Sequence, residues 1–114
     1  MKRPKVPRHE RAHNRARVGP LKKTLVKPRT AMLYRSAVQL FFFWLKAQRL
    51  PWPEDGDELD ARVCEFGEMA WEEGETRALY ANLISGIPWY EESLRQHLCS
   101  SRRLLSAWDR NEWT

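Results

Sequence analysis

The residues whose spacing most suggests chemistry are two histidines and a glutamate in the run from His9 to His13, which reads H-E-R-A-H. The run matches H-E-x-x-H, in which a helix presents two zinc ligands one turn apart with a glutamate base beside them. A zinc site of this kind needs a rigid, partly buried helix and a third ligand. Here Pro7 precedes the run, cations surround it, and the next acid downstream is Glu54. We therefore expect neither a metal site nor a metalloprotease.

No other set of side chains has the spacing of a catalytic site. The chain has no glycine-rich phosphate loop, and no Ser/His/Asp or Cys/His set whose spacing indicates catalysis. His97 lies beside an apolar helical stripe without a Cys or Asp at ligand spacing, which is typical of a packed or surface histidine. We therefore expect a protein that is not an enzyme and that uses no cofactor and no small-molecule substrate.

The cysteines and the apolar runs bear on location. Cys64 and Cys99 show no pairing pattern and indicate reduced thiols of an intracellular protein, with a disulfide as the alternative. No signal peptide is visible, and the run Leu40 to Leu45 is far shorter than the roughly 20 residues of a membrane helix. We expect no membrane partner. The basic run Lys2-Arg3-Pro4-Lys5 would suit nuclear import in a eukaryote, and otherwise we expect the cytoplasm or nucleoid.

Charge divides the chain near Thr30. Residues 1–29 carry 11 Lys/Arg against the single acid Glu10, a net charge of +10, whereas residues 30–114 carry 9 against 14 acids, a net charge of −5. Prolines interrupt the basic stretch, and it offers little apolar surface to bury. We therefore predict a disordered, extended basic arm over residues 1–29 that meets a polyanion, and a folded acidic body over residues 30–114.

Helical periodicity runs through the body in four stretches. Thr30 is expected to cap a first helix that ends near Leu50, and Asp57 a second that ends at Gly74. Thr76 is expected to cap a third helix, which Gly86, Pro88 and Trp89 end. The fourth is expected over residues 91–111. No strand pattern competes, so the body is predicted to be an all-α, four-helix orthogonal bundle.

Apolar and aromatic side chains indicate which helix faces form the core. In the first helix the expected face contains seven residues, and Phe42 and Phe43 lie outside it, which predicts a second packing side or a partner. The face is Leu33, Tyr34, Ala37, Phe41, Trp44, Leu45 and Gln48. Most tryptophans are expected in the core, whereas Trp52 and Trp89 fall in predicted loops and stay open as base-stacking residues. The small side of the third helix would suit either a nucleic-acid groove or helix packing.

The body resembles the core-binding, SAM-like domain of tyrosine recombinases of the phage-integrase type. The resemblance begins at Thr30 to Leu50, which has the aromatic and aliphatic ending of the family's first helix, and continues through residues 59–74, 78–88 and 94–108. The segment Arg102 to Trp108 resembles the last helix of mobile-element members. The resemblance covers most of the body and none of the arm.

This resemblance implies half of a helical clamp that grips duplex DNA during integration and recombination, with other recombinase protomers as further partners. In such recombinases a tyrosine attacks the phosphodiester from a separate, following domain. The present chain has no H-x-x-R, and Tyr34, Tyr80 and Tyr90 all fall inside the helical body. We therefore expect a truncated product or an excised fragment that binds DNA without catalysis.

The expected DNA contacts are basic or polar positions in the arm, at the starts of the first and third helices, and beside the apolar stripe of the fourth, where several arginines form one flank. They are Lys22, Lys23, Lys27, Arg29, Thr30, Arg35, Arg77, Arg95, Arg102 and Arg103. The alternative is a helical protein-interaction domain whose basic arm binds RNA or an acidic partner and whose body never touches nucleic acid.

Overall fold

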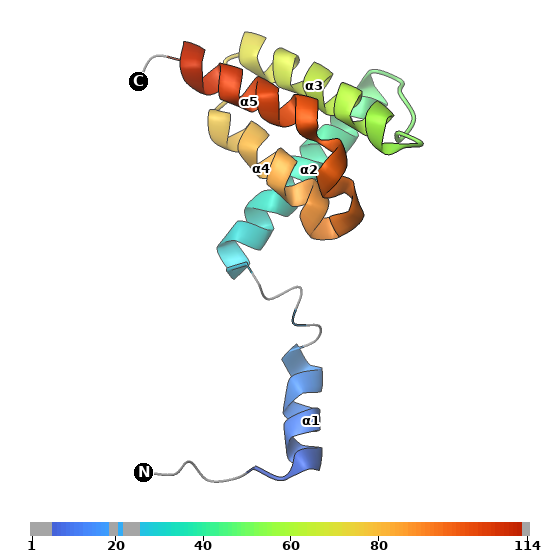
Figure 1. Ribbon diagram of the computed structural model, residues 1–114, viewed down its shortest axis with the longest axis vertical. Coiled ribbons are helices and arrows are strands. Elements are labelled where there is room, and N and C mark those ends of the chain that lie inside the picture. Colours follow the sequence, from blue (N-terminus) through green and yellow to red (C-terminus); the bar gives the residue numbers. More distant parts are fainter. Residues whose placement is uncertain (1–5, 19–20, 22–25, 113–114) are drawn as a thin grey trace.

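The computed structural model describes residues 6–18, 21 and 26–112, and every regular element in these residues is helical (Figure 1). The prediction of an all-α fold is confirmed. The elements are α1 (Arg8–Val18), α2 (Pro28–Ala47), α3 (Gly56–Glu72), α4 (Arg77–Tyr90), the 3₁₀ helix η2 (Glu92–His97) and α5 (Cys99–Asn111). Lys22 and Lys23, two of the expected DNA contacts, lie outside the described residues.

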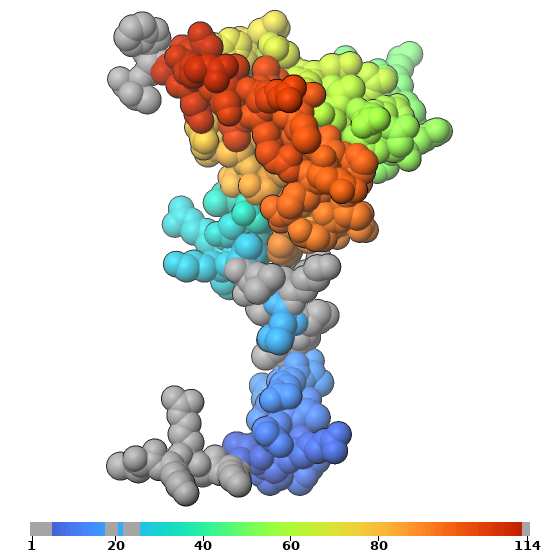
Figure 2. Space-filling view, viewed as in Figure 1, coloured from blue at the N-terminus to red at the C-terminus, as the bar shows by residue number. Residues whose placement is uncertain are grey.

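Helix α1 corrects the prediction of an extended arm. The residues between Pro7 and Pro20 contain no proline, and alanine and arginine favour a helix. Pro7 is tolerated at the helix start, and its carbonyl accepts the first hydrogen bond, from the Arg11 N–H at 3.0 Å. Side chains of residues 8–17 are all exposed, and the space-filling view shows α1 standing clear of the bundle (Figure 2).

Helix α2 supplies one side of the core. Lys27, not Thr30, is its N-cap, because Pro28 has the fixed φ that suits the first helical position. Ala37, Phe41 and Leu45 are buried, which confirms the centre of the predicted face. Leu33 and Gln48, at its edges, are exposed, and so are Phe42 and Phe43. The helix therefore buries a narrower stripe than the periodicity predicts.

Helix α3 is capped two residues earlier than expected, by Asp55 instead of Asp57. The Asp55 carboxylate accepts from the Glu58 N–H at 2.8 Å, and the Glu58 carboxylate accepts from the Glu54 N–H at 3.1 Å, so each side chain satisfies one backbone donor at the helix start. The predicted core residues of this helix are buried, and they are Leu59, Val63, Phe66 and Ala70. Gly74 adopts a φ of +78°, which confirms it as the left-handed residue that follows the helix.

Helix α4 continues through Gly86, Pro88 and Trp89, the residues expected to end it, and ends at Tyr90. Its start is as expected, since the Thr76 hydroxyl accepts from the Leu79 N–H at 3.3 Å. A Cβ on Gly86 would lie 3.1 Å from both the Cβ and the carbonyl oxygen of Tyr34, so the glycine lets α4 lie close against α2. Pro88 removes only one hydrogen bond near the helix end and is itself buried. Here the small residue Gly86 serves helix packing.

The predicted fourth helix is two elements. Glu91 has an extended backbone that separates α4 from η2, and Leu98 then joins η2 to α5 and is fully buried. The break lets Asp60 of α3 reach the start of α5, where its carboxylate accepts from the N–H groups of Ser100 at 3.0 Å and Ser101 at 2.9 Å. A capping side chain from another helix thus decides where α5 begins.

Aromatic rings fill the centre of the bundle. Phe41 meets Phe66 edge to face at 5.6 Å between ring centroids, and Tyr80 stacks on Trp108 at 6.0 Å. Trp108 is buried as predicted, whereas Trp71 meets its edge and remains 41% exposed. Among the described residues, no helix has the length and apolar character needed to cross a membrane.

Candidate nucleic-acid interface

Helix α1 carries a stripe of arginines. Arg8, Arg11 and Arg15 are spaced by three and four residues and therefore share one face. Arg17 lies elsewhere on the helix, and Glu10 is its only acid. Because every one of these side chains is exposed, the arginines are accessible to phosphate groups.

The H-E-x-x-H run lies on α1, so its two histidines do stand one turn apart on a helix. They are exposed rather than partly buried. Within the described residues, the structure places no three His, Cys, Asp or Glu side chains where they could hold a metal ion together. The exposed arginines make α1 a cationic surface.

The first turn of α2 is a second cationic position. Lys27 and Arg29 are exposed, and Thr30 is half-buried. The side chain of the N-cap residue Lys27 makes no capping hydrogen bond, and the first turn of the helix contains no acid. The positive end of the helix dipole is therefore combined with two cationic side chains, an arrangement that attracts phosphate.

An open cleft of 410 Å³ lies beside that helix end. It is lined by residues from the start of α2 and the end of α4, namely Val26, Pro28, Ala31, Arg35, Trp89 and Tyr90. The Arg35 guanidinium carbon lies 5.8 Å from the centroid of the Trp89 ring. Arg35 is one of the expected DNA contacts and Trp89 is a residue left open for base stacking, whereas Tyr90, which is 48% exposed, was not among the expected site residues. Only its position next to Trp89 could have drawn attention to Tyr90.

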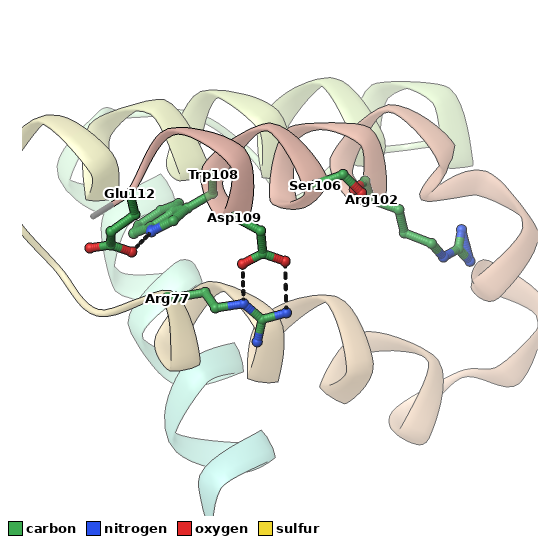
Figure 3. A network of polar contacts seen from close by, with 6 residues as sticks. All are labelled: Arg77, Arg102, Ser106, Trp108, Asp109 and Glu112. Carbon is green, nitrogen blue, oxygen red and sulfur yellow. Dashed lines mark hydrogen bonds and ion pairs between the residues drawn. The ribbon is translucent and has the colours of Figure 1, made fainter. Parts of the chain in front are cut away.

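Arg77 is engaged by an acid from another helix. Its Nε lies 2.5 Å from the Asp109 Oδ1 and its Nη2 lies 3.2 Å from Oδ2, a bidentate pair that joins the start of α4 to the end of α5 (Figure 3). The hydrogen bond raises the pKa of Arg77 and lowers the pKa of Asp109. Both side chains remain about half exposed, so a phosphate could reach Arg77 only in competition with Asp109.

The expected flank of arginines on the fourth helix is divided. Arg95 lies on η2 and pairs with Glu92 at 2.8 Å, which raises the pKa of Arg95. The Arg102 Nη2 donates to the Arg95 carbonyl, and Figure 3 shows this side chain extending away from the Arg77–Asp109 pair. Arg103 and Arg110 are exposed and seven residues apart, so they share the outer face of α5.

A buried polar cluster fixes α5 and therefore the arginines on it. Asp60 is 8% exposed, and its Oδ1 also accepts from the Ser101 hydroxyl at 2.6 Å. Burial raises the pKa of Asp60, but the hydrogen bonds from Ser101 and Ser100 outweigh that effect and hold the pKa below its usual value. Arg102 and Arg103 follow Ser101 directly, so Asp60 helps to position these two arginines without contacting them.

The exposed face of α3 is acidic. Glu65, Glu68 and Glu72 are exposed there, and Arg62, the helix's only cation, pairs with Glu65 at 3.0 Å. This face repels phosphate. Exposed cations lie instead on α1, at both ends of α2 and on the outer face of α5.

No protein-family model, curated protein or solved structure matches this chain. The resemblance of residues 30–114 to a recombinase core-binding domain therefore stays a prediction. Evidence for what the chain binds comes from its charges, its exposed side chains and its cleft.

Proposed function

We propose that this chain is a DNA-binding module that holds duplex DNA through α1 and the start of α2. The observation that carries the proposal is the arginine stripe of α1, on a helix whose side chains from residue 8 to residue 17 are all exposed. Lys27, Arg29 and Arg103 are further exposed cations on the bundle. Recombination, with further protomers as partners, is the process that the resemblance to the core-binding domain suggests for this module.

The dimensions of α1 suit the major groove. An α-helix with its side chains is about 10–12 Å across, and the major groove of B-DNA is about 12 Å wide. Arginines on one face would contact the phosphates along the groove, while the small side chains of Ala12 and Ala16 allow close approach. A short helix without buried side chains is marginal in water, so phosphate contacts would also stabilise α1 itself.

Neutralising the α1 stripe tests the proposal. In the full chain, Arg11→Gln with Arg15→Gln should weaken duplex DNA binding by about tenfold or more at moderate salt, because two phosphate contacts are lost. A matched control removes two exposed cations from the other end of α2, Lys46→Gln with Arg49→Gln, and should change the affinity far less. Equal losses in the two variants would show that net charge alone, rather than α1, attracts the DNA.

A second candidate function is a helical protein-interaction domain, and an apolar stripe on α2 favours it. Met32, Leu33, Leu40 and Phe43 are 64%, 46%, 49% and 60% exposed. Leu33 and Leu40 are seven residues apart and Phe43 follows three residues later, which is the a and d spacing of a helix-pairing seam. Large exposed apolar stripes commonly mark a protein interface. Replacing Leu40 and Phe43 by Gln should leave duplex binding intact if this stripe serves a protein partner.

A further inference from the structure

We propose that the cleft between α2 and α4 binds an unpaired base of a nucleic-acid strand, whose phosphate lies at the N-terminus of α2. This inference deepens the DNA-binding function proposed above and rests on it. The volume of the cleft, 410 Å³, falls in the range of about 300–1,000 Å³ that is usual for small-ligand sites. The cleft therefore has room for one base with its sugar.

The walls of the cleft have the chemistry that stacks bases. Trp89 and Tyr90 meet edge to face at 4.9 Å between ring centroids, and both residues line the cleft. Tyr90 is 48% exposed, and Arg35 lies over Trp89. Aromatic rings and guanidinium planes are the usual partners of unpaired bases in single strands. A base inside a duplex cannot reach such a site, because both of its faces are stacked on neighbouring pairs.

The phosphate position follows from the start of α2. Pro28 both lines the cleft and is the first residue of the helix, so the base site and the helix end are adjacent. Lys27, the N-cap residue, has an extended backbone and makes no side-chain capping bond, which leaves the helix end available to an external anion. The exposed side chains of Lys27 and Arg29 add positive charge at the same end.

The acids near the cleft are engaged elsewhere. Glu92 pairs with Arg95 at 2.8 Å, and the Glu91 carboxylate accepts from the Ser93 hydroxyl at 2.9 Å. Neither acid lines the cleft, where Arg35 is the only charged lining residue among those described. The charge of the site therefore favours an anionic ligand.

A base within a strand fits better than a free nucleotide. Lys27 and Arg29 lie at the junction with the basic arm, whose cations would hold the phosphates that follow along a strand. A free nucleotide offers the same base and one phosphate without those further contacts. We therefore assign the site to single-stranded nucleic acid, or to a base that has left the duplex stack.

The test compares a short oligothymidine single strand with a duplex of the same length, both titrated with the full chain. Tyr90→Ala should weaken single-strand binding by about 5- to 100-fold, the effect of losing one base–aromatic stack, and should leave duplex affinity unchanged. Tyr90→Phe should retain the single-strand affinity because it keeps the ring. Trp52→Ala is the matched control, since Trp52 is 47% exposed and packs on Phe41 and Phe42 away from the cleft.

Each further outcome decides a separate point. Thermal melting verifies that the Tyr90→Ala variant is folded. If its single-strand affinity is then unchanged, the base site is overturned, whereas continued duplex binding would still support the proposed function. Equal losses on the single strand and the duplex would also overturn the base site, because the cleft would then contact backbone only. A wild-type chain that binds neither probe would overturn the DNA-binding function itself. Thymidine monophosphate that competes as well as the strand would overturn the assignment to a strand.

Discussion

Asp60 is the buried charge on which the position of α5 depends. Its carboxylate accepts hydrogen bonds from two N–H groups at the start of α5 and from the Ser101 hydroxyl. A carboxylate is the better acceptor here, because an amide in its place would direct an N–H group toward another donor. The residue thus stabilises the helix that carries Arg102 and Arg103.

Replacing this carboxylate tests its role in stability. Asp60→Asn should lower the free energy of unfolding at pH 7 by about 1.5–3 kcal/mol, the usual worth of a hydrogen bond to a charged group. Because the pKa of Asp60 is lowered by folding, its charge stabilises the protein above the unfolded value near 3.8 and loses this effect as the pH falls through the folded pKa. Urea unfolding at pH 7 and pH 3 should show the difference between the two proteins narrowing in acid. A difference that stays constant would mean that the carboxylate charge is not what stabilises α5.

The cations on the bundle differ in availability. Arg77 and Arg95 each make an ion pair with an acid, whereas the exposed Arg103 side chain makes no ion pair or hydrogen bond with the residues that the structure describes. Exposed ion pairs are worth at most about 1 kcal/mol, so a phosphate can displace the acid but gains less than it would at a free arginine. Arg103 is therefore expected to matter more for DNA affinity than Arg77 or Arg95.

At the scale of elements, α1 differs from the other α-helices because its described side chains are exposed on all sides. An isolated helix of this length exchanges readily with coil in water. Amide hydrogen exchange should therefore show little protection for residues 8–18 in the free chain and clear protection when saturating duplex DNA is added. Strong protection in the free chain would show that α1 is held by contacts other than nucleic acid.

Residue spacing and side-chain type predict the elements whose faces and ends depend on residues that are near in the sequence. The buried faces of α2 and α3, the Thr76 cap and Gly74 all follow from spacing and side-chain type. The predictions were wrong where a distant residue intervenes. Gly86 continues a helix because it packs on Tyr34, and α5 begins at residue 99 because Asp60 caps it.

The candidate site shows the same limit. The sequence indicates which residues are cationic, but it does not indicate that Asp109, 32 positions away, engages Arg77. Nor does it place Pro28 beside Tyr90, since that proximity arises only when α2 packs on α4. The prolines of the arm predict an extended chain. The interval between Pro7 and Pro20 contains none, however, and it is long enough for α1.

At the scale of the whole molecule, charge is segregated by element. Exposed cations lie on α1, at both ends of α2 and on the outer face of α5, while α3 carries six acids against one arginine. This separation orients the chain on a polyanion, since the acidic face is repelled and the cationic surface is attracted.

The central claim, that α1 and its neighbouring cations hold duplex DNA, is tested most directly by the salt dependence of binding. Arg8, Arg11, Arg15, Lys27, Arg29 and Arg103 together predict a slope of log affinity against log salt of about −5 for the full chain. Deleting residues 1–18, which removes α1 and leaves the described core residues in place, should reduce the slope by about 3 units. A slope that is unchanged by the deletion would contradict the account, because the phosphate contacts would then belong to the bundle alone.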